Sequence, residues 1–301
     1  MLANKYRPQN FDQVLGQDVI IKILQKQIAN KNYNHSILFT GNAGCGKTTC
    51  ARIFANQIDG EIYELDCASH NGVADIKDII EKARTNSLIH EYKVFILDEC
   101  HTLSSSAWPA LLITLEENLP NTIFIFCTTD AQKIPNTIIS RVERFNFLPI
   151  NDSIIEQRLK DICNIENIAF EDSAIAVIAK ASHGSLRQSL TNLDTCIDYG
   201  DITNENVRKV LNIVSDDIFS DLTTSIHNHD IKQIIDLVNA IYNNGYELHQ
   251  FVRQYLDYAI EIRDIDLTEI LVNLLNEIRY DECPKNIIIA RFITYTPESP
   301  D

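Results

Sequence analysis

Basic side chains are scarce in this chain of 301 residues, where 26 Lys and Arg stand against 42 Asp and Glu. The formal net charge of −16 argues against a protein that coats DNA through its overall field. The deficit is uneven, because residues 1–150 hold 14 basic and 16 acidic side chains while residues 151–301 hold 12 and 26. Any contact with DNA must therefore come from a local patch in the first half. For the second half, a surface that only keeps the protein soluble explains the acidity equally well.

Long apolar runs and paired cysteines are also missing. No run of about 18 apolar residues occurs, so no membrane-spanning helix is expected. The N-terminus lacks the apolar core of a signal peptide, which points to the cytosol. The eight scattered cysteines include no C-x-x-C pair, so we expect mostly buried free thiols of a reducing compartment and no structural zinc site.

The most informative stretch present is Gly41–Thr48 (GNAGCGKT), which fits the phosphate-binding pattern G-x-x-x-x-G-K-[ST] without a mismatch. It follows an apolar run, Ser36–Thr40, that is typical of a buried strand, and Thr49–Gln57 has the pattern of a helix. Such a loop wraps backbone N–H groups around phosphate oxygens, and the helix N-terminus adds partial positive charge. We expect Lys47 to reach the β- and γ-phosphates and the Thr48 hydroxyl to bind Mg²⁺; a plain glycine turn is the alternative. The loop residues expected to surround the nucleotide are Asn42, Ala43, Gly44, Cys45, Gly46, Lys47, Thr48 and Thr49.

Five β-rich runs separated by helical patterns indicate a parallel α/β sheet in the first half. They are Ser36–Thr40, Glu61–Asp66, Lys93–Asp98, Thr122–Thr128 and the short Arg144–Leu148. After Pro149 the chain has helical patterns, three in residues 152–200 and five more beyond Gly200. We therefore expect a nucleotide-binding domain at 1–150, helical domains at 151–202 and 203–301, and a frayed end at 297–301.

An acidic pair, Asp98 and Glu99, follows the apolar run Val94–Leu97 about fifty residues after the phosphate loop. Two carboxylates at a strand end are by themselves more often a solvated cap. Behind an intact phosphate loop they suit Mg²⁺-dependent hydrolysis, in which Asp98 holds the metal through water and Glu99 deprotonates the attacking water. Kinases and small GTPases lack this pairing, which favours a motor or switch ATPase.

Several more motifs occur in the order and at the spacing of one known family. They are Lys5–Pro8 (KYRP), Gly16-Gln17, Leu65–Ile76 (LDCASHNGVADI), Asp98–His101 (DECH), Leu115–Glu117 (LEE), Thr128–Asp130 (TTD), Gln132-Lys133, Ser140-Arg141 and Gly184–Arg187 (GSLR). Over about residues 4–200 the chain resembles the ATPase subunits of sliding-clamp loaders in the AAA+ class. It is most similar to the gamma/tau subunit of bacterial DNA polymerase III, and similar to the small subunits of replication factor C. The resemblance implies a P-loop AAA+ fold with a five-stranded parallel sheet at 1–150, a helical lid at 151–202 and an all-α collar at 203–301 that holds subunits together.

The resemblance also implies roles for residues at matching positions. Thr128 is expected to be sensor 1, which helps to place the hydrolytic water, and Arg187 to be sensor 2, which reaches the γ-phosphate from the lid. Arg141 alone is most simply a solvated charge, but in a Ser-Arg-Val version of the family's Ser-Arg-Cys motif it is expected to be an arginine finger acting in trans. Lys133 and Thr137 resemble positions that touch template phosphates. The residues expected to line the adenine pocket are Arg7, Pro8, Val14, Gly16 and Gln17.

The chain departs from the family at two places. Bacterial relatives carry a four-cysteine zinc module after the phosphate-loop helix, whereas only Asp59-Gly60 links that helix to the next strand here. The family's Asn-Ala-Leu-Leu-Lys segment, near the machinery that senses the clamp and DNA, reads Pro109–Ile113 here. We expect Pro109 in the first turn of a helix, where its missing N–H costs nothing. Trp108 is expected to pack in the core rather than to anchor the clamp.

The residues predict a motor or switch ATPase with ATP and Mg²⁺ as cofactors and no zinc. The resemblance implies that this ATPase opens a sliding clamp and loads it on primer–template DNA during replication. Its expected partners are other clamp-loader subunits in a pentameric ring, the clamp and the DNA, with no membrane. The expected location is the cytoplasm, in association with the nucleoid, or the host cytoplasm for a viral protein. Two other functions stay open. One is a different AAA+ ATPase that remodels DNA in branch migration or recombination, and the other is a non-hydrolysing stator-type subunit that supplies only its arginine finger.

Overall fold

The computed structural model describes residues 1–85, 87–117 and 119–295, which fall into two units. Unit 1 comprises Met1–Ile168 and Ile178–Asp194, and unit 2 comprises Ala169–Val177 and the described residues from Thr195 onward. The chain therefore leaves unit 1, returns to it, and then continues in unit 2. The segment 297–301, which the sequence predicts to be frayed, lies outside the described residues.

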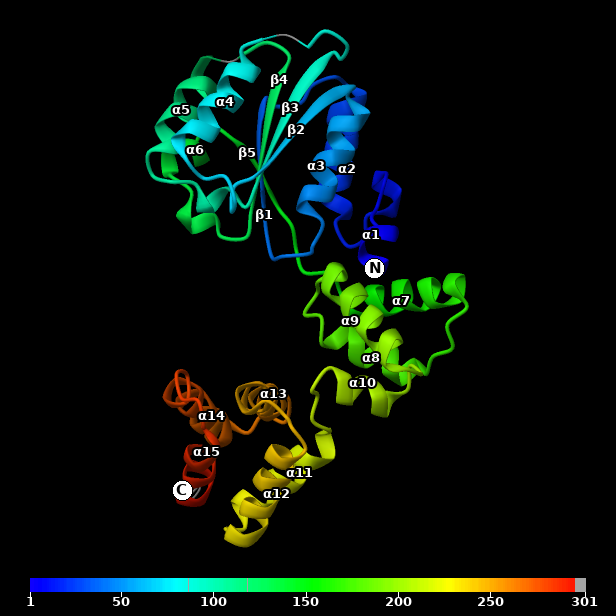
Figure 1. The fold of residues 1–301 in the computed structure, drawn as a ribbon, viewed down its shortest axis with the longest axis vertical. Helices are drawn as coiled ribbons and strands as arrows, with labels where there is room; N and C mark the ends of the chain where they lie inside the picture. Colours follow the sequence, from blue (N-terminus) through cyan, green and yellow to red (C-terminus); the bar gives the residue numbers. More distant parts are fainter. Residues whose placement is uncertain (86, 118, 296–301) are drawn as a thin grey trace. The chain divides into compact units, whose positions relative to one another are not determined.

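A five-stranded parallel sheet forms the centre of unit 1 (Figure 1). Every residue of its first and fourth strands is buried, as expected for inner strands that are covered on both faces. The predicted fold class is confirmed, and the last strand begins one residue earlier and ends two residues earlier than predicted. The strands lie in the order β2-β3-β4-β1-β5, with bounds β1 (Ser36–Thr40), β2 (Gly60–Asp66), β3 (Tyr92–Asp98), β4 (Thr122–Thr128) and β5 (Glu143–Asn146).

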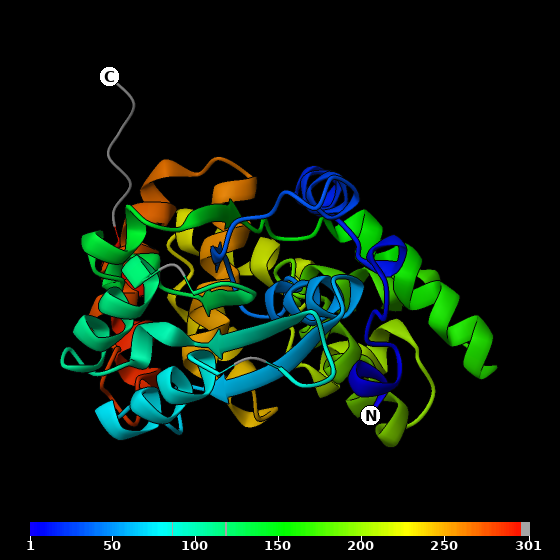
Figure 2. The same ribbon diagram turned by 90° about the horizontal axis from the view of Figure 1, so that it is seen from above.

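Helices cover both faces of the sheet (Figures 1 and 2). Along β3, Val94 and Ile96 point into the core of one face, and Phe95 and Leu97 point into the core of the other. This packing fixes the carboxyl ends of β1, β3 and β4 side by side, so the motifs that follow these strands meet at one edge. The first face carries α2 (Asp18–Ala29) and α3 (Lys47–Gln57), and the second carries α4 (Val73–Ala83), α5 (Ala107–Glu117) and α6 (Asn136–Ile139).

The N-terminal segment lies beside helices that come much later in the sequence (Figures 1 and 2). The Leu2 N–H donates to Asp194 Oδ2 at 2.7 Å, and Lys5 Nζ lies 2.6 Å from Glu166 Oε1. The Tyr6 hydroxyl donates to Glu166 as well. These bonds hold the KYRP motif against the helices at 152–166 and 186–199. The contacts join α1 (Leu2–Lys5) to α7 (Asp152–Glu166) and to the unit 1 part of α9 (Leu186–Tyr199). Elsewhere in unit 1, short 3₁₀ turns occupy Phe11–Gln13, Cys100–Thr102 and Ala131–Lys133.

The described part of unit 2 is helical apart from its connecting segments and an isolated parallel bridge between Phe170 and Ile202. Its core surrounds Tyr255, whose ring stacks on Phe219 with the centroids 5.2 Å apart. The last helix is not predicted from the sequence, because three successive isoleucines at 287–289 hide the helical period. The helix that begins at Asn204 ends at Val210, shortly before Asn212 takes a left-handed backbone with φ 57°. After α8 (Asp172–Lys180), which like α9 belongs to both units, the helices are α10 (Asn204–Val210), α11 (Asp216–His227), α12 (Ile231–Asn243), α13 (Leu248–Glu261), α14 (Ile265–Glu277) and α15 (Lys285–Thr294).

Several predictions about single side chains are also confirmed. All eight cysteines are free, and all except Cys283 are buried. Trp108 is buried in the second sheet face and packs near Phe126, and Pro109 is the third residue of α5.

Within the described ranges, no helix is long and apolar enough to cross a membrane. The same residues include no cluster of three or more His, Cys, Asp or Glu that could hold a metal; the absence of zinc stays a prediction.

Candidate active site

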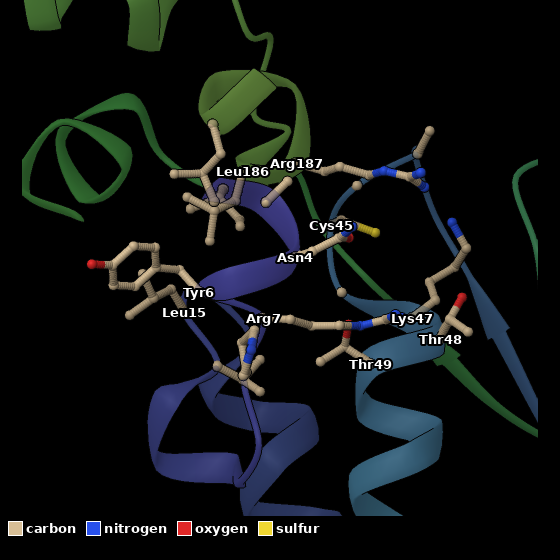
Figure 3. A pocket seen from close by; sticks show the side chains of 18 of the residues that line it. Asn4, Tyr6, Arg7, Leu15, Cys45, Lys47, Thr48, Thr49, Leu186 and Arg187 are labelled. Carbon is tan, nitrogen blue, oxygen red and sulfur yellow. The ribbon is translucent and has the colours of Figure 1, made fainter. Parts of the chain in front are cut away.

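A cavity of about 230 Å³ in unit 1 is lined by the ends of several elements (Figure 3). Four segments contribute most of its wall: the N-terminal segment, the loop between β1 and α3, the end of β3, and the start of α9. Apolar side chains such as Leu15 and Leu186 gather at one end, and Lys47, Thr48 and Arg187 lie toward the other (Figure 3). The cavity therefore suits a ligand with an apolar part and a charged part.

The loop of residues 41–46 leaves the first turn of α3 open toward the cavity. Gly46 precedes the helix with φ 106°, a backbone conformation that favours glycine, and a Cβ there would meet no atom within 4 Å. No side chain caps this helix, so its first N–H groups are available to an anion, which the helix dipole also attracts. An open, uncapped first turn fits a phosphate chain.

Lys47 begins α3, and its ammonium group is held within the loop. Nζ lies 2.8 Å from Gly41 O and 2.9 Å from Asn42 O, and the residue is buried. Cys45 Sγ donates to the same Asn42 carbonyl at 2.9 Å. Two ammonium hydrogens are therefore used, and the third remains for an oxygen in the cavity.

Thr48 and Asp98 bring two oxygen groups together where α3 begins and β3 ends. The Thr48 hydroxyl donates to Asp98 Oδ2 at 2.7 Å. Hydroxyl and carboxylate oxygens are hard ligands of the kind that Mg²⁺ prefers, and Mg²⁺ usually completes its shell with waters and phosphate oxygens. The pair fits a magnesium ion that also contacts a bound polyphosphate.

Glu99 follows β3 and is tied to the end of β4. Its Oε2 accepts hydrogen bonds from the Thr129 N–H and hydroxyl, at 3.3 and 3.0 Å, and lies 3.3 Å from His101 Nδ1. The same His101 nitrogen lies 3.1 Å from the Thr128 hydroxyl, and Thr128 is fully buried. A polar network therefore joins the two strand ends beside the cavity, with a carboxylate at its centre.

Two arginines reach the cavity from different segments. Arg187, near the start of α9, is exposed, and within the described part of the chain its guanidinium has no hydrogen bond or ion pair. Arg7 Nε donates to the Thr49 hydroxyl at 3.1 Å. Burial lowers the pKa of Arg7, and the nearby cations Arg52 and Arg187 lower it further. Guanidinium groups without a bound carboxylate, beside Lys47, make this end of the cavity favourable for an anion.

The apolar end includes two of the residues predicted to line an adenine pocket, Pro8 and Val14. Gly16, Gln17 and Asn42 are not among the lining residues. Instead, the Gln17 side chain bonds to the backbone of Leu148: Nε2 donates to the carbonyl oxygen at 2.7 Å, and Oε1 accepts from the N–H at 3.2 Å. Lining residues that were not predicted are Ala3, Asn4, Tyr6, Ile150, Leu186 and Leu190.

Family models match this chain in three consecutive segments. Residues 37–150 match the ATPase family associated with various cellular activities (AAA), residues 154–202 match the ATPase lid domain of the DNA polymerase III clamp loader subunit, and residues 202–281 match domain III of DNA polymerase III subunits gamma and tau. A DNA polymerase III subunit gamma from Buchnera aphidicola is 30% identical over 98% of this chain and 87% of its own length. The chain belongs to the DNA polymerase III gamma/tau family.

Other gamma/tau proteins are similar but longer. The tau subunit of Bacillus subtilis is 33% identical over 93% of this chain and 54% of its own length. The gamma/tau subunit of Mycoplasma genitalium is 36% identical over 86% of this chain and 48% of its own length. The chain thus spans about half the length of these two relatives. Among solved structures, the Holliday junction branch migration motor RuvB of Thermotoga maritima has a TM-score of 0.59 at 19% identity, over 85% of this chain and 91% of RuvB. This likeness shows a shared fold, and membership in the AAA family implies use of a nucleotide and, in most members, of Mg²⁺.

Four more residues predicted from the gamma/tau resemblance do not line the cavity: Thr128, Lys133, Thr137 and Arg141. Arg141 Nη2 lies 2.7 Å from Glu116 Oε1, and its Nη1 donates to the Thr137 carbonyl at 2.8 Å. Lys133 Nζ lies 3.2 Å from Asp130 Oδ2. A finger that acts in trans belongs outside its own cavity, so this position leaves the predicted role of Arg141 open to test.

Sequence reasoning assigned no role to Thr129 or His101 in this family member. Both stand inside motifs that the sequence shows, TTD and DECH, next to the acidic pair. The hydroxyls of Thr128 and Thr129 at a strand end were the sequence signal for such a role. Their bonds near Glu99, however, depend on the pairing of β3 with β4.

Proposed function

We propose that this gamma/tau family member is the ATPase subunit of a clamp loader, which uses ATP binding and hydrolysis to open a sliding clamp and load it on primer–template DNA during replication. The observation that carries the proposal is the meeting of Lys47, Thr48, Asp98 and Glu99 in one cavity of unit 1. The matches to a clamp-loader lid and to a gamma/tau domain support the choice of a clamp loader.

ATP binding follows from the division of the cavity. The uncapped first turn of α3 and the free hydrogen of Lys47 bind phosphate oxygens, Arg187 reaches the γ-phosphate from the lid, and the apolar end receives the adenine. Thr48 and Asp98 would hold Mg²⁺, which would offset the negative charge of the phosphates. The loop residues Asn42, Ala43, Gly44, Cys45, Gly46 and Thr49 complete the predicted nucleotide site.

Hydrolysis in this proposal depends on Glu99. Its carboxylate accepts the proton of the water that attacks the γ-phosphate, and its bonds to Thr129 and His101 orient it. Thr128, whose hydroxyl belongs to the same network, helps to place that water as sensor 1. Such positioned polar groups are sufficient for these roles, because catalysis of phosphoryl transfer depends mainly on positioning and on electrostatic stabilisation.

The remaining predicted residues act between subunits or on DNA, in a chain of several domains. We infer three domains: a nucleotide-binding domain at 1–150, a lid at 151–202 and a collar at 203–301. The family models support these boundaries because they end at residue 150 and meet at residue 202. In a ring of five subunits, Arg141 acts on the neighbouring ATP, while Lys133 and Thr137 contact template phosphates. A soluble replication protein of this kind belongs in the cytoplasm, at the nucleoid.

ATP turnover by the loader assembled with its clamp tests this function. With wild-type chain, we expect primed DNA and the clamp together to raise turnover. Arg141→Ala should lower the stimulated rate by about 10³-fold or more, because the finger offsets transition-state charge. Arg144→Ala, which removes another exposed arginine nearby, should leave the rate unchanged. Strand migration without clamp stimulation would instead favour another DNA-remodelling ATPase, and a wild-type chain that hydrolyses nothing would favour a stator.

A further inference from the structure

The side chain of Arg7 points away from the apolar end of the cavity (Figure 3). Tyr6 and Leu15 lie at the apolar end of the cavity, whereas the Arg7 side chain extends away from them toward the start of α3 (Figure 3). There its Nε donates to the Thr49 hydroxyl at 3.1 Å. Thr49 is the third residue of α3, within the same uncapped turn that begins at Lys47. The guanidinium therefore lies at the helix N-terminus.

The charges around Arg7 leave it without a bound carboxylate. Arg52, the charge that most lowers the pKa of Arg7, is itself paired with Glu64 through two hydrogen bonds of 2.6 and 2.5 Å. Asp98, the other carboxylate that favours the charged form of Arg7, accepts the Thr48 hydroxyl. Of the five N–H groups of the guanidinium, only one has a partner among the described residues. Arg7 is half-buried, and even partial burial of a cation with open donors is costly unless an anion binds it.

We propose that Arg7 binds the phosphate chain of the nucleotide, at the end nearest the nucleoside, and does not contact the base. A phosphate held by the first turn of α3 lies within reach of a guanidinium that already touches Thr49. The planar fork of Arg7 can donate two parallel hydrogen bonds to such a phosphate. Arg187 then serves the opposite end of the chain, so that Lys47 lies between two arginines. This inference rests on the proposed nucleotide site and assigns Arg7 to the polyphosphate.

A ligand that lacks a base distinguishes contact of Arg7 with the phosphate chain from contact with the base. Displacement of fluorescent mant-ADP from the full chain gives the affinities of ADP and of inorganic tripolyphosphate. We expect Arg7→Gln to weaken both by the same factor, about 10- to 100-fold, because it removes charge-assisted hydrogen bonds that both ligands use. Arg7→Lys should restore part of the affinity for both, since a point charge remains.

Arg52→Gln is the matched control, because it removes a nearby charge that does not line the cavity. Its effect on both ligands should stay within about threefold at moderate salt, where long-range fields are screened. If Arg7→Gln weakens ADP but leaves tripolyphosphate unchanged, Arg7 contacts the base and the inference is wrong. Unchanged affinity for both ligands overturns it as well. A wild-type chain that binds neither ligand, or a Lys47→Ala chain that binds both normally, contradicts the proposed nucleotide site instead.

Discussion

Among single residues, Glu99 is held in place by both its backbone and its side chain. Its backbone is left-handed, with φ 46°, which costs a residue with a side chain about 1 kcal/mol. Its carboxylate is held by Thr129 and lies beside His101. A carboxylate fixed in this way needs little reorganisation before it accepts a proton, which is a property expected of a general base.

Glu99→Gln should separate hydrolysis from binding. The amide keeps the shape of the side chain and loses its basicity, so we expect ATP turnover by the assembled loader to fall by about 10²- to 10⁴-fold. The affinity for mant-ADP should change by less than about threefold, since Glu99 is not needed to hold the phosphates. Glu91→Gln, at an exposed position, serves as the control. An equal loss of affinity and turnover in Glu99→Gln would show that Glu99 acts in binding.

At the scale of elements, the segment 147–150 between β5 and α7 connects the phosphate loop to the lid within unit 1. The Phe147 N–H donates to the Thr40 carbonyl at 2.7 Å, and the Ile150 N–H donates to the Gly184 carbonyl at 3.0 Å. A Cβ at Gly41 would lie 2.3 Å from the Phe147 carbonyl oxygen, and one at Gly184 would lie 2.5 Å from a carbon of Pro149. Backbone therefore contacts this segment from both sides, with no space for larger residues.

Gln17 also stabilises this segment, because its side-chain amide forms hydrogen bonds with both the carbonyl and the N–H group of Leu148. Gln17→Ala should lower the free energy of unfolding by about 1–3 kcal/mol, since two backbone polar groups lose their partners. Urea unfolding of the ligand-free chain measures this change. Gln13→Ala, which removes an exposed glutamine bonded to Gln9, should cost less than about 0.5 kcal/mol. Equal costs for the two variants would contradict the role of Gln17.

In unit 2, His249 connects the start of α13 to the end of α14. Nε2 lies 2.8 Å from the Ile278 carbonyl oxygen, and Nδ1 lies 2.8 Å from Glu247 Oε1. Since both neighbours are acceptors, only the imidazolium can donate to both. The bond to Ile278 raises the pKa of His249 above its ordinary value of 6.5 despite burial, and Glu247 raises it further, while Arg253 opposes this.

This raised pKa gives a definite pH dependence. The stabilisation by His249 is fully present below the unfolded pKa near 6.5, and it is lost as the pH rises through the higher folded pKa. The thermal midpoint of the wild type, minus that of His249→Gln, should therefore decrease as the pH rises from below 6.5 through the raised pKa of His249. Differential scanning calorimetry at several pH values measures it. A difference that stays constant or increases over this range would contradict the assignment of the imidazolium.

At the scale of the whole chain, local patterns predicted most of the fold and only part of the site. The five strands and the phosphate loop are continuous in sequence and bury apolar residues with a clear period, so they could be predicted. The role of Gln17 could not, because Leu148 is far from it in the chain and close only in the fold. The same holds for Thr129, which reaches Glu99 through the pairing of β3 with β4.

The central claim is that the cavity above α3 binds the nucleotide that the assembled loader hydrolyses. ATP turnover by a loader in which every copy of this chain carries Lys47→Ala tests it most directly, with Lys22→Ala, at an exposed position in α2, as the control. We expect turnover in the presence of clamp and primed DNA to fall about 100-fold or more in Lys47→Ala, because the buried ammonium group that faces the phosphates is lost. Turnover equal to that of the wild type and of Lys22→Ala would contradict the claim.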